Sequence, residues 1–190
     1  MKRLFVAVGL DAQTREAVDR ISSAVRELMV QKGASGRVTW VRKDRMHLTV
    51  LFLGAADEAL ERRLLGALAE PIPLTPFALD FRGLGCFPSK GSPRVLWLRA
   101  DLGADRLCRV HDEIMRRIGD RKPGREPFNP HLTLARFRDR VRRADLEEIA
   151  ARPAFAGPCL IDRVTLYESH LSPKGPAYEP LAEATFTACT

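Results

Sequence analysis

The sequence predicts an α+β fold with antiparallel strands, on three grounds. Predicted strands follow one another directly as well as alternating with helices, whereas parallel strands need a long crossover connection between them. A tetrapeptide of the form His-x-Thr-x occurs twice, at 47–50 and 131–134, and indicates an internal duplication. The 190 residues suit one domain, or two small lobes that share an interface.

Strands are predicted where short runs of branched and aromatic residues stand between turn-forming residues. Gly54 ends one such run, and Gly/Pro-rich loops at 83–93 and 172–180 interrupt the later ones. In chain order, the predicted strands are 4–10, 38–41, 47–53, 77–81, 95–99, 132–135, 164–167 and 182–186.

Helices are predicted where apolar residues recur every three or four positions. Asp11 or Thr14 is expected to cap the first helix, and the prolines that begin at Pro71 are expected to stop the second. In chain order, the predicted helices are 11–31, 58–69, 102–118 and 145–150. The apolar face of the third helix consists of Leu107, Val110, Ile114 and Ile118.

Composition restricts the class of protein. Hydrophobic residues make up 45% of the chain, which is ample for a folded core. The longest apolar runs, at 4–10 and 48–53, are too short to span a bilayer, and Asp11 closes the first run before any signal-peptide cleavage site. We therefore expect a cytoplasmic protein with no membrane partner. The four cysteines show no metal-ligand spacing and are expected to be free thiols.

The charge balance is basic. Lysine and arginine outnumber aspartate and glutamate by 31 to 24, which gives a formal net charge of +7. A basic protein favours a polyanionic partner, and nucleic acid is the obvious candidate. A solvated, arginine-rich surface would have the same composition, so the charge alone does not decide between the two.

Each motif is expected to place a histidine and a threonine on one face of a strand. Successive strand residues point to opposite faces, so His47 lies with Thr49 and His131 lies with Thr133. Neither histidine has a second ligand at metal-binding spacing, and the chain contains no nucleophile elbow, P-loop or dinucleotide motif. Acid–base catalysis remains, in which one neutral histidine accepts a proton and one protonated histidine donates a proton.

A pair of this kind suits displacement at phosphorus, where a base and an acid act on opposite sides of the phosphoryl group. The hydroxyls of Thr49 and Thr133 can donate to its non-bridging oxygens. Arg136 is a candidate to neutralise the phosphate, and Lys43 or Arg45 are the candidates nearest the first motif. Such a site needs no metal ion.

Several sequence blocks resemble one known family. The second motif stands within Phe-Asn-Pro-His-Leu-Thr-Leu-Ala-Arg at 128–136, and the first within His-Leu-Thr-Val-Leu-Phe-Leu-Gly at 47–54. Together with blocks at 3–7, 83–97 and 166–178, they resemble the two-histidine (2H) phosphoesterase superfamily. Within it, they resemble the RNA 2′,3′-cyclic phosphodiesterases, also called 2′-5′ RNA ligases.

The resemblance implies a fold and a reaction. The fold is a single α+β domain over 1–190 with two similar lobes, in which two antiparallel sheets with flanking helices are related by pseudo-two-fold symmetry. The active-site cleft lies between the lobes. The reaction is hydrolysis of RNA 2′,3′-cyclic phosphate ends to 2′-phosphomonoesters without a metal or other cofactor. The partners implied are RNAs with such ends, including tRNA fragments, and a monomer is expected.

The resemblance also implies roles for the motif residues. His47 would be the proton donor and His131 the proton acceptor, while Thr49, Thr133 and Arg136 would bind the phosphate. Aromatic side chains that could stack on a base are Trp40, Phe87 and Tyr178, although each is equally explained as a core or loop-anchoring residue. The remaining histidines, His111 and His170, are expected on a helix surface and at a loop or rim.

Three alternative functions stay open. The same two histidines could catalyse the reverse reaction, 2′-5′ ligation of tRNA halves. A different small cyclic phosphate could be the substrate, because the motifs contact the phosphate and not the base. A non-catalytic RNA- or nucleotide-binding module of the same fold is a third possibility, although both histidines and both threonines are retained here.

Overall fold

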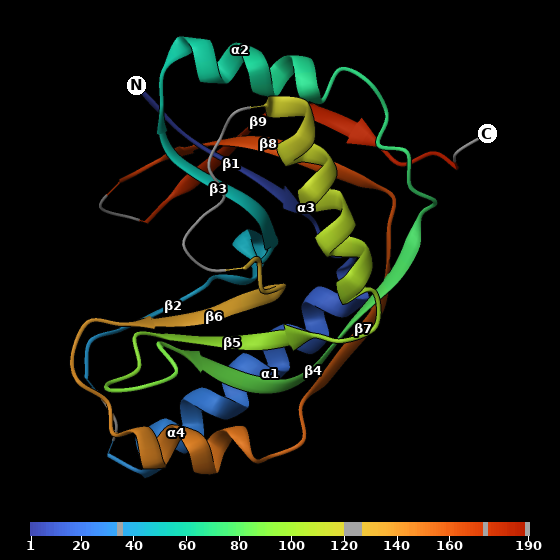
Figure 1. The fold of residues 1–190 in the computed structure, drawn as a ribbon. Helices are drawn as coiled ribbons and strands as arrows, with labels where there is room; N and C mark the ends of the chain where they lie inside the picture. The colour runs from blue at the N-terminus through green and yellow to red at the C-terminus, as the bar shows by residue number, and fades with distance from the viewer. Residues whose placement is uncertain (34–35, 120–126, 173–174, 189–190) are drawn as a thin grey trace.

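The computed structural model describes residues 1–33, 36–119, 127–172 and 175–188. Within these residues, helices and strands are mixed along the chain, as predicted for an α+β fold (Figure 1). In chain order the elements are β1 (Lys2–Val8), α1 (Ala12–Gln31), β2 (Val38–Trp40), the 3-10 turn η1 (Lys43–Arg45), β3 (Leu48–Ala56), α2 (Glu58–Ala67), β4 (Phe77–Phe87), β5 (Val95–Ala100), α3 (Ala104–Ile118), β6 (His131–Phe137), α4 (Arg143–Ala150), β7 (Phe155–Ile161), β8 (Arg163–His170) and β9 (Ala177–Thr185).

The strands of the described residues form one sheet in the order β7-β4-β5-β6-β3-β1-β8-β9, with β2 paired to β6. The pairings between these strands are antiparallel, as predicted. The prediction of two separate sheets is wrong, because Leu48 of β3 pairs with Leu132 of β6. This one pair joins a β3 half (β3, β1, β8, β9) to a β6 half (β2, β6, β5, β4, β7) at the place where the two motif strands begin.

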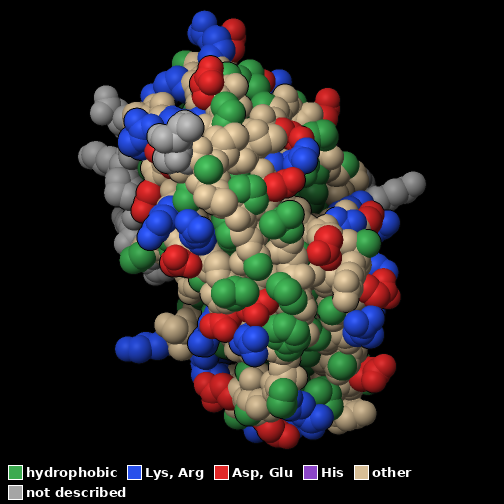
Figure 2. Space-filling model, turned by 90° about the vertical axis from the view of Figure 1, so that its right-hand side faces the viewer, with side chains coloured by type: hydrophobic (Ala, Val, Ile, Leu, Met, Phe, Trp, Pro, Cys, Tyr) green, Lys and Arg blue, Asp and Glu red, His purple; other side chains and the backbone are tan. Residues whose placement is uncertain are grey.

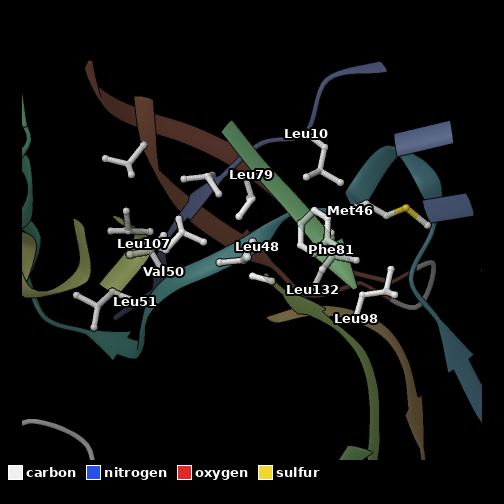
Figure 3. Packing of buried hydrophobic residues seen from close by; sticks show 14 of the residues in the cluster. Leu10, Met46, Leu48, Val50, Leu51, Leu79, Phe81, Leu98, Leu107 and Leu132 are labelled. Atoms are coloured by element: carbon white, nitrogen blue, oxygen red, sulfur yellow. The ribbon is translucent and has the colours of Figure 1, made fainter. Parts of the chain in front are cut away.

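The helices cover the two halves separately (Figure 1). Helices α2 and α3 pack on β3, whereas α1 packs on β7 and α4 packs on β4. Leu48 and Leu132 are fully buried in the same core cluster as the apolar faces of these helices, and Figure 3 shows the two leucines close together. The helices therefore pack on the sheet face to which these two leucines point.

Helix positions agree with the hydrophobic periodicity more closely than strand ends do. The predicted apolar face of α3 is buried in full, and Asp11 caps α1 by accepting a hydrogen bond from the Thr14 amide. Strand β4 continues to Phe87, beyond the glycine at 83 that was predicted to open a loop. Strand β7 was not predicted, because Pro158 interrupts its apolar pattern; β7 is an edge strand, where a missing amide proton is tolerated.

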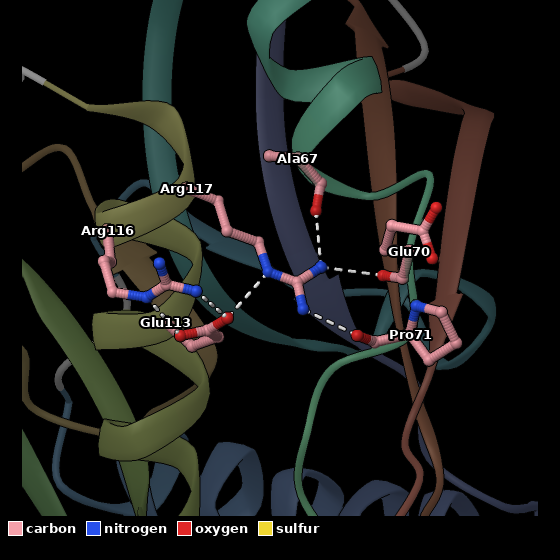
Figure 4. A network of polar contacts seen from close by, with 6 residues as sticks. All are labelled: Ala67, Glu70, Pro71, Glu113, Arg116 and Arg117. Carbon is pink, nitrogen blue, oxygen red and sulfur yellow. Dashed lines mark hydrogen bonds and ion pairs between the residues drawn. The ribbon is translucent and has the colours of Figure 1, made fainter.

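A single arginine, Arg117, binds the backbone at and just after the C-terminal end of α2 (Figure 4). The Arg117 guanidinium donates to the Ala67 and Glu70 carbonyls at 2.9 and 2.7 Å, and to the Pro71 carbonyl at 2.6 Å. Its Nε also donates to Glu113 at 2.7 Å. The last carbonyls of a helix lack partners within the helix, so Arg117 satisfies the carbonyl of the final residue of α2, binds two carbonyls of the segment after it, and ties α3 to α2.

Replacing Arg117 with methionine should lower the free energy of unfolding by about 2–4 kcal/mol, because several carbonyls and Glu113 lose a charged donor. Urea denaturation followed by circular dichroism measures this change. Arg116→Met is the matched control: Arg116 is 70% exposed and contacts Glu113 alone among these groups, so its loss should change stability by under about 1 kcal/mol. Equal effects of the two substitutions would contradict this role of Arg117.

Candidate active site

The two motifs lie on one face of the sheet where β3 and β6 meet. Leu48 and Leu132, the second residues of the motifs at 47–50 and 131–134, are paired across the strands and both are buried. Paired residues point to the same face, and their neighbours along each strand point to the other. The histidine and threonine of each motif therefore point together to the face opposite the helices.

Each motif strand contains a bulge at the fourth residue of its motif. The register between β1 and β3 skips Val50, and the register between β5 and β6 skips Leu134. A bulge reverses the alternation of side chains beyond it, and accordingly Leu134 and Ala135 are both fully buried. Arg136 therefore points to the same face as His131, although their separation of five residues would put them on opposite faces of a regular strand.

Both imidazole rings are fixed by equivalent hydrogen bonds. Nδ1 of His47 lies 2.8 Å from the Arg45 carbonyl oxygen, and Nδ1 of His131 lies 2.7 Å from the Asn129 carbonyl oxygen. A carbonyl oxygen only accepts, so Nδ1 is the donor in both rings. In the neutral form of each ring, Nε2 is then the nitrogen that accepts a proton.

Each ring also packs between two aromatic rings of its own half of the sheet. The centroid distances are 5.0 and 5.1 Å in the β3 half, and 5.0 and 5.8 Å in the β6 half. The partners are Phe5 and Tyr178 for His47, and Phe87 and Trp97 for His131. These walls restrict the access of water to the imidazoles.

Burial and a shared cation lower the pKa of both histidines. The main cause is the loss of solvation, which disfavours the charged ring, and the hydrogen bond from Nδ1 partly opposes it. The Arg136 guanidinium lowers the pKa of His47 and of His131 further. Because one cation acts on both rings, the two histidines lie within electrostatic range of a common positive charge.

Some of the other residues predicted to contribute to the site contact the motif histidines, and others do not. Phe87 and Tyr178 contact the histidines, whereas Trp40 packs with Arg26, whose guanidinium lies 5.1 Å from its ring centroid. Lys43 forms an ion pair with Glu16 of α1. The Arg45 carbonyl holds His47, and the charge of Arg45 acts on the Tyr178 hydroxyl, where burial raises the pKa more than Arg136 and Arg45 lower it.

Sequence reasoning missed Phe5 and Trp97. Trp97 pairs with Thr133 across β5 and β6, so it points to the site face, and its ring lies over Gly85, where a Cβ atom would be 2.4 Å from the indole. The indole Nε1 is buried and has no hydrogen-bond partner among the described residues. The glycine in β4 was the available signal, because a glycine inside a strand often marks a close approach of another group.

The other two histidines lie apart from this constellation. His111 stacks on Phe128 with ring centroids 4.8 Å apart. His170 lies 3.0 Å from Glu179 and 3.8 Å from Glu168. In the described ranges, these last three residues are the one set of histidine, cysteine or carboxylate side chains close enough to share a metal ion, with ligand atoms within 4.8 Å. That set includes neither motif histidine.

The excess basic charge of the protein does not form a patch on the side of the molecule shown in Figure 2. Figure 2 shows one side of the molecule, on which basic and acidic side chains are interspersed and no histidine reaches the surface. No described helix is both long and apolar enough to cross a membrane.

The chemistry of the site follows from its side chains. Two ring nitrogens able to exchange protons, two threonine hydroxyls and a guanidinium are suited to an anion such as a phosphate ester.

Comparison with known proteins gives concordant matches. The family description "2′-5′ RNA ligase superfamily" matches residues 8–173. The chain is 36% identical over 182 residues to an RNA 2′,3′-cyclic phosphodiesterase of Archaeoglobus fulgidus, covering 94% of this chain and 97% of the relative. It is 31% identical over 189 residues to the protein of the same name from Thermotoga maritima, covering 97% and 95%.

Solved structures match over the same extent. A crystal structure from Thermus thermophilus superposes with a TM-score of 0.79 at 29% identity, covering 98% of both chains. The crystal structure of E. coli LigT complexed with 3′-AMP superposes with a TM-score of 0.72 at 26% identity, also covering 98% of both chains.

Proposed function

The chain belongs to the 2′-5′ RNA ligase superfamily, and on that basis we propose that it hydrolyses the 2′,3′-cyclic phosphate ends of RNA through its paired motifs. The observation that supports this most strongly is the pairing of Leu48 with Leu132, which directs both motifs to one face. The relatives named RNA 2′,3′-cyclic phosphodiesterase support the choice of substrate, with tRNA fragments as candidate natural ends.

In the proposed reaction, Nε2 of His131 accepts a proton from water as the water oxygen attacks phosphorus. The bond from phosphorus to the 3′ oxygen breaks, and Nε2 of His47 donates a proton to that oxygen. The products are a 2′-phosphomonoester and a free 3′-hydroxyl. Both protons move through nitrogens that are oriented by the Nδ1 hydrogen bonds, which supports a division of labour between two similar groups.

The threonine hydroxyls of the two motifs and the Arg136 guanidinium are proposed to bind the non-bridging oxygens. The bulge at Leu134 supports this role for Arg136, because it turns the side chain to the histidine face. The equivalent bulge at Val50 supports a pseudo-two-fold relation between the two halves of the sheet, with the active-site cleft between two lobes of one domain. No step in this scheme requires a metal ion.

The lowered histidine pKa values make the proposed activity dependent on pH. Both pKa values lie below the ordinary 6.5, so in the free enzyme the state with one ring protonated is most populated on the acid side of neutrality. A bound phosphodiester anion favours the protonated ring and raises both pKa values. The bell-shaped profile of kcat/KM is therefore expected to have its maximum below pH 7, and the profile of kcat is expected to lie at higher pH.

The test is hydrolysis of a short oligonucleotide ending in a 2′,3′-cyclic phosphate, in EDTA, between pH 5 and pH 9. We expect undiminished turnover in EDTA, a bell-shaped profile, and a 2′-phosphomonoester identified by phosphorus NMR. A 3′-phosphomonoester product or complete inhibition by EDTA would contradict the mechanism. Absence of turnover on this substrate and on a cyclic mononucleotide would favour the binding module.

A further inference from the structure

One ring of the aromatic wall beside His131 lies at the end of a strand, next to a loop. Phe5 and Tyr178, which contact His47, lie within β1 and β9 and are fixed by strand pairing. Phe87, which contacts His131, is the last residue of β4: it pairs with Val95 of β5, and the Arg94 amide donates to its carbonyl at 2.6 Å, but residues 88–94 beyond it contain no helix or strand. Phe87 is therefore restrained by strand pairing on the β5 side and by whatever holds the loop that follows it.

Arg143, the first residue of α4, binds the first half of this loop. Its Nη2 donates to the Pro88 carbonyl at 2.8 Å and to the Gly91 carbonyl at 2.9 Å, and its Nε donates to Gly91 at 3.1 Å. Its Nη1 lies 3.4 Å from Sγ of Cys86, the residue before Phe87. One guanidinium thus holds the backbone at Pro88 and Gly91 and contacts the strand residue that precedes the phenylalanine.

Two further connections run between the same segments. Arg94 donates to the Arg138 carbonyl at 2.7 Å, and the Ser92 hydroxyl lies 3.5 Å from the Val141 carbonyl. Both contact the far side of the loop. Of the three side chains, Arg143 is the one that contacts both residues next to Phe87 in the chain, Cys86 and Pro88, and it is only 26% exposed.

Phe87 passes this restraint to the site. Its ring centroid lies 4.9 Å from Trp97 and 5.0 Å from His131, so it covers both rings. Burial is the main cause of the lowered pKa of His131. Movement of Phe87 would admit water to the imidazole and allow its protonated form to be solvated.

We propose that Arg143 is a positioning residue for His131, acting through the 88–91 loop and Phe87 without touching the substrate. The proposed effect of Arg143 on the position of His131 does not depend on the proposed function. Its effect on turnover does rest on the proposed function. The inference goes beyond the two motifs, because it connects one of the two histidines, and not the other, to α4.

Among the described residues, the charged and titratable groups on the side of His131 are Arg136 on its own strand, Arg99 opposite it on β5, and His47 before β3. Substitution of Arg143 leaves all three in place. Loss of the Arg143 charge is matched by substitution of Arg142, which is 82% exposed and whose nearest carboxylate is Asp145 at 3.9 Å. A change specific to Arg143 is therefore a change of contacts and not of net charge.

The test is an NMR titration of the histidine Cε1–H resonances in wild type, Arg143→Met, Phe87→Ala and Arg142→Met, with His131 assigned from His131→Ala. In Arg143→Met and in Phe87→Ala, the pKa of His131 should rise by about half a pH unit or more, while that of His47 stays constant. Arg142→Met should leave both values unchanged, and Arg143→Lys, which retains a donor, should give an intermediate shift. This readout needs no turnover, so it remains valid if the proposed reaction is wrong.

Kinetics give a second, separate readout. In Arg143→Met, kcat/KM should fall by about tenfold, since misplacing a reacting group is enough to slow the reaction, and one limb of the pH profile should move to higher pH. The limb that moves would show whether His131 has the lower or the higher of the two apparent pKa values. A His131 pKa that stays unchanged in Arg143→Met, or an equal shift of both histidines, would overturn the proposal.

Discussion

Replacing His131 with alanine is expected to lower kcat/KM for a cyclic-phosphate RNA end by about a thousandfold, because general acid–base catalysis contributes about 10²–10⁴-fold. His47→Ala is expected to cause a loss of the same order, since both proton transfers occur in one displacement. Loss of either imidazole removes the Nε2 that exchanges the proton. This nitrogen is oriented because Nδ1 of the same ring binds a backbone carbonyl oxygen, at 2.8 Å for His47 and 2.7 Å for His131. Steady-state kinetics at the wild-type pH optimum measures each effect.

The double variant distinguishes a cooperating pair from two independent groups. Residues that act as a unit are strongly non-additive, so His47→Ala combined with His131→Ala should lose little more activity than either variant alone. His170→Ala is the matched control, because that histidine pairs with Glu179 at the β8–β9 edge and should leave kcat/KM unchanged. A folded His131→Ala protein with more than about a tenth of wild-type activity would mean that the second motif is structural.

The second large effect is expected at Arg136. Arg136→Met should lower kcat/KM by about a hundredfold, because it removes a charged donor from the proposed oxyanion contacts. It should also change the pH profile. The guanidinium lowers the pKa of His47 and His131, so its removal raises both values and moves both limbs of the bell to higher pH.

The shift of both limbs separates Arg136 from Arg143, for which one limb is expected to move. Arg136→Lys should recover part of the rate and restore the position of both limbs, because it keeps the charge but not the planar donor pair. Arg138→Met removes an exposed charge two residues further on and should have little effect. Wild-type kcat/KM in Arg136→Met would show that the shared cation has no part in phosphate binding.

The motif residues could be predicted because a strand has a period of two. His47 with Thr49, and His131 with Thr133, share a face under the simplest rule, and the structure has both pairs on that face. The apolar face of α3 could be predicted for the corresponding reason, since helical periodicity is regular over its whole length. Local repetition of residue types is sufficient information in both cases.

The remaining features depend on register, which residue types alone do not determine. Nothing in residues 131–136 marks Leu134 as a bulge, yet the bulge decides on which face Arg136 lies. The Leu48–Leu132 pair, which makes one sheet of two expected sheets, brings together segments far apart in the chain. Arg143 is equally unpredictable, because its partners are backbone carbonyls of a distant loop.

The interleaving of the chain through the sheet has a consequence for folding during synthesis. Strands β1 and β3 are translated before most of the β6 half, with only β2 of that half between them, but the β3 half also contains β8 and β9, which end at Thr185. Between β3 and β8, the chain contains β4, β5, β6 and β7, which are the remaining strands of the β6 half. Helix α1, which precedes β2 in the chain, packs on β7 of this half. The β3 half therefore remains incomplete in every nascent chain that ends before β8, and β1, which pairs with β3 on one side, lacks its second neighbour until β8 has been translated. Truncation before β8 should thus yield a nascent chain that is recognised by chaperones rather than an isolated stable lobe.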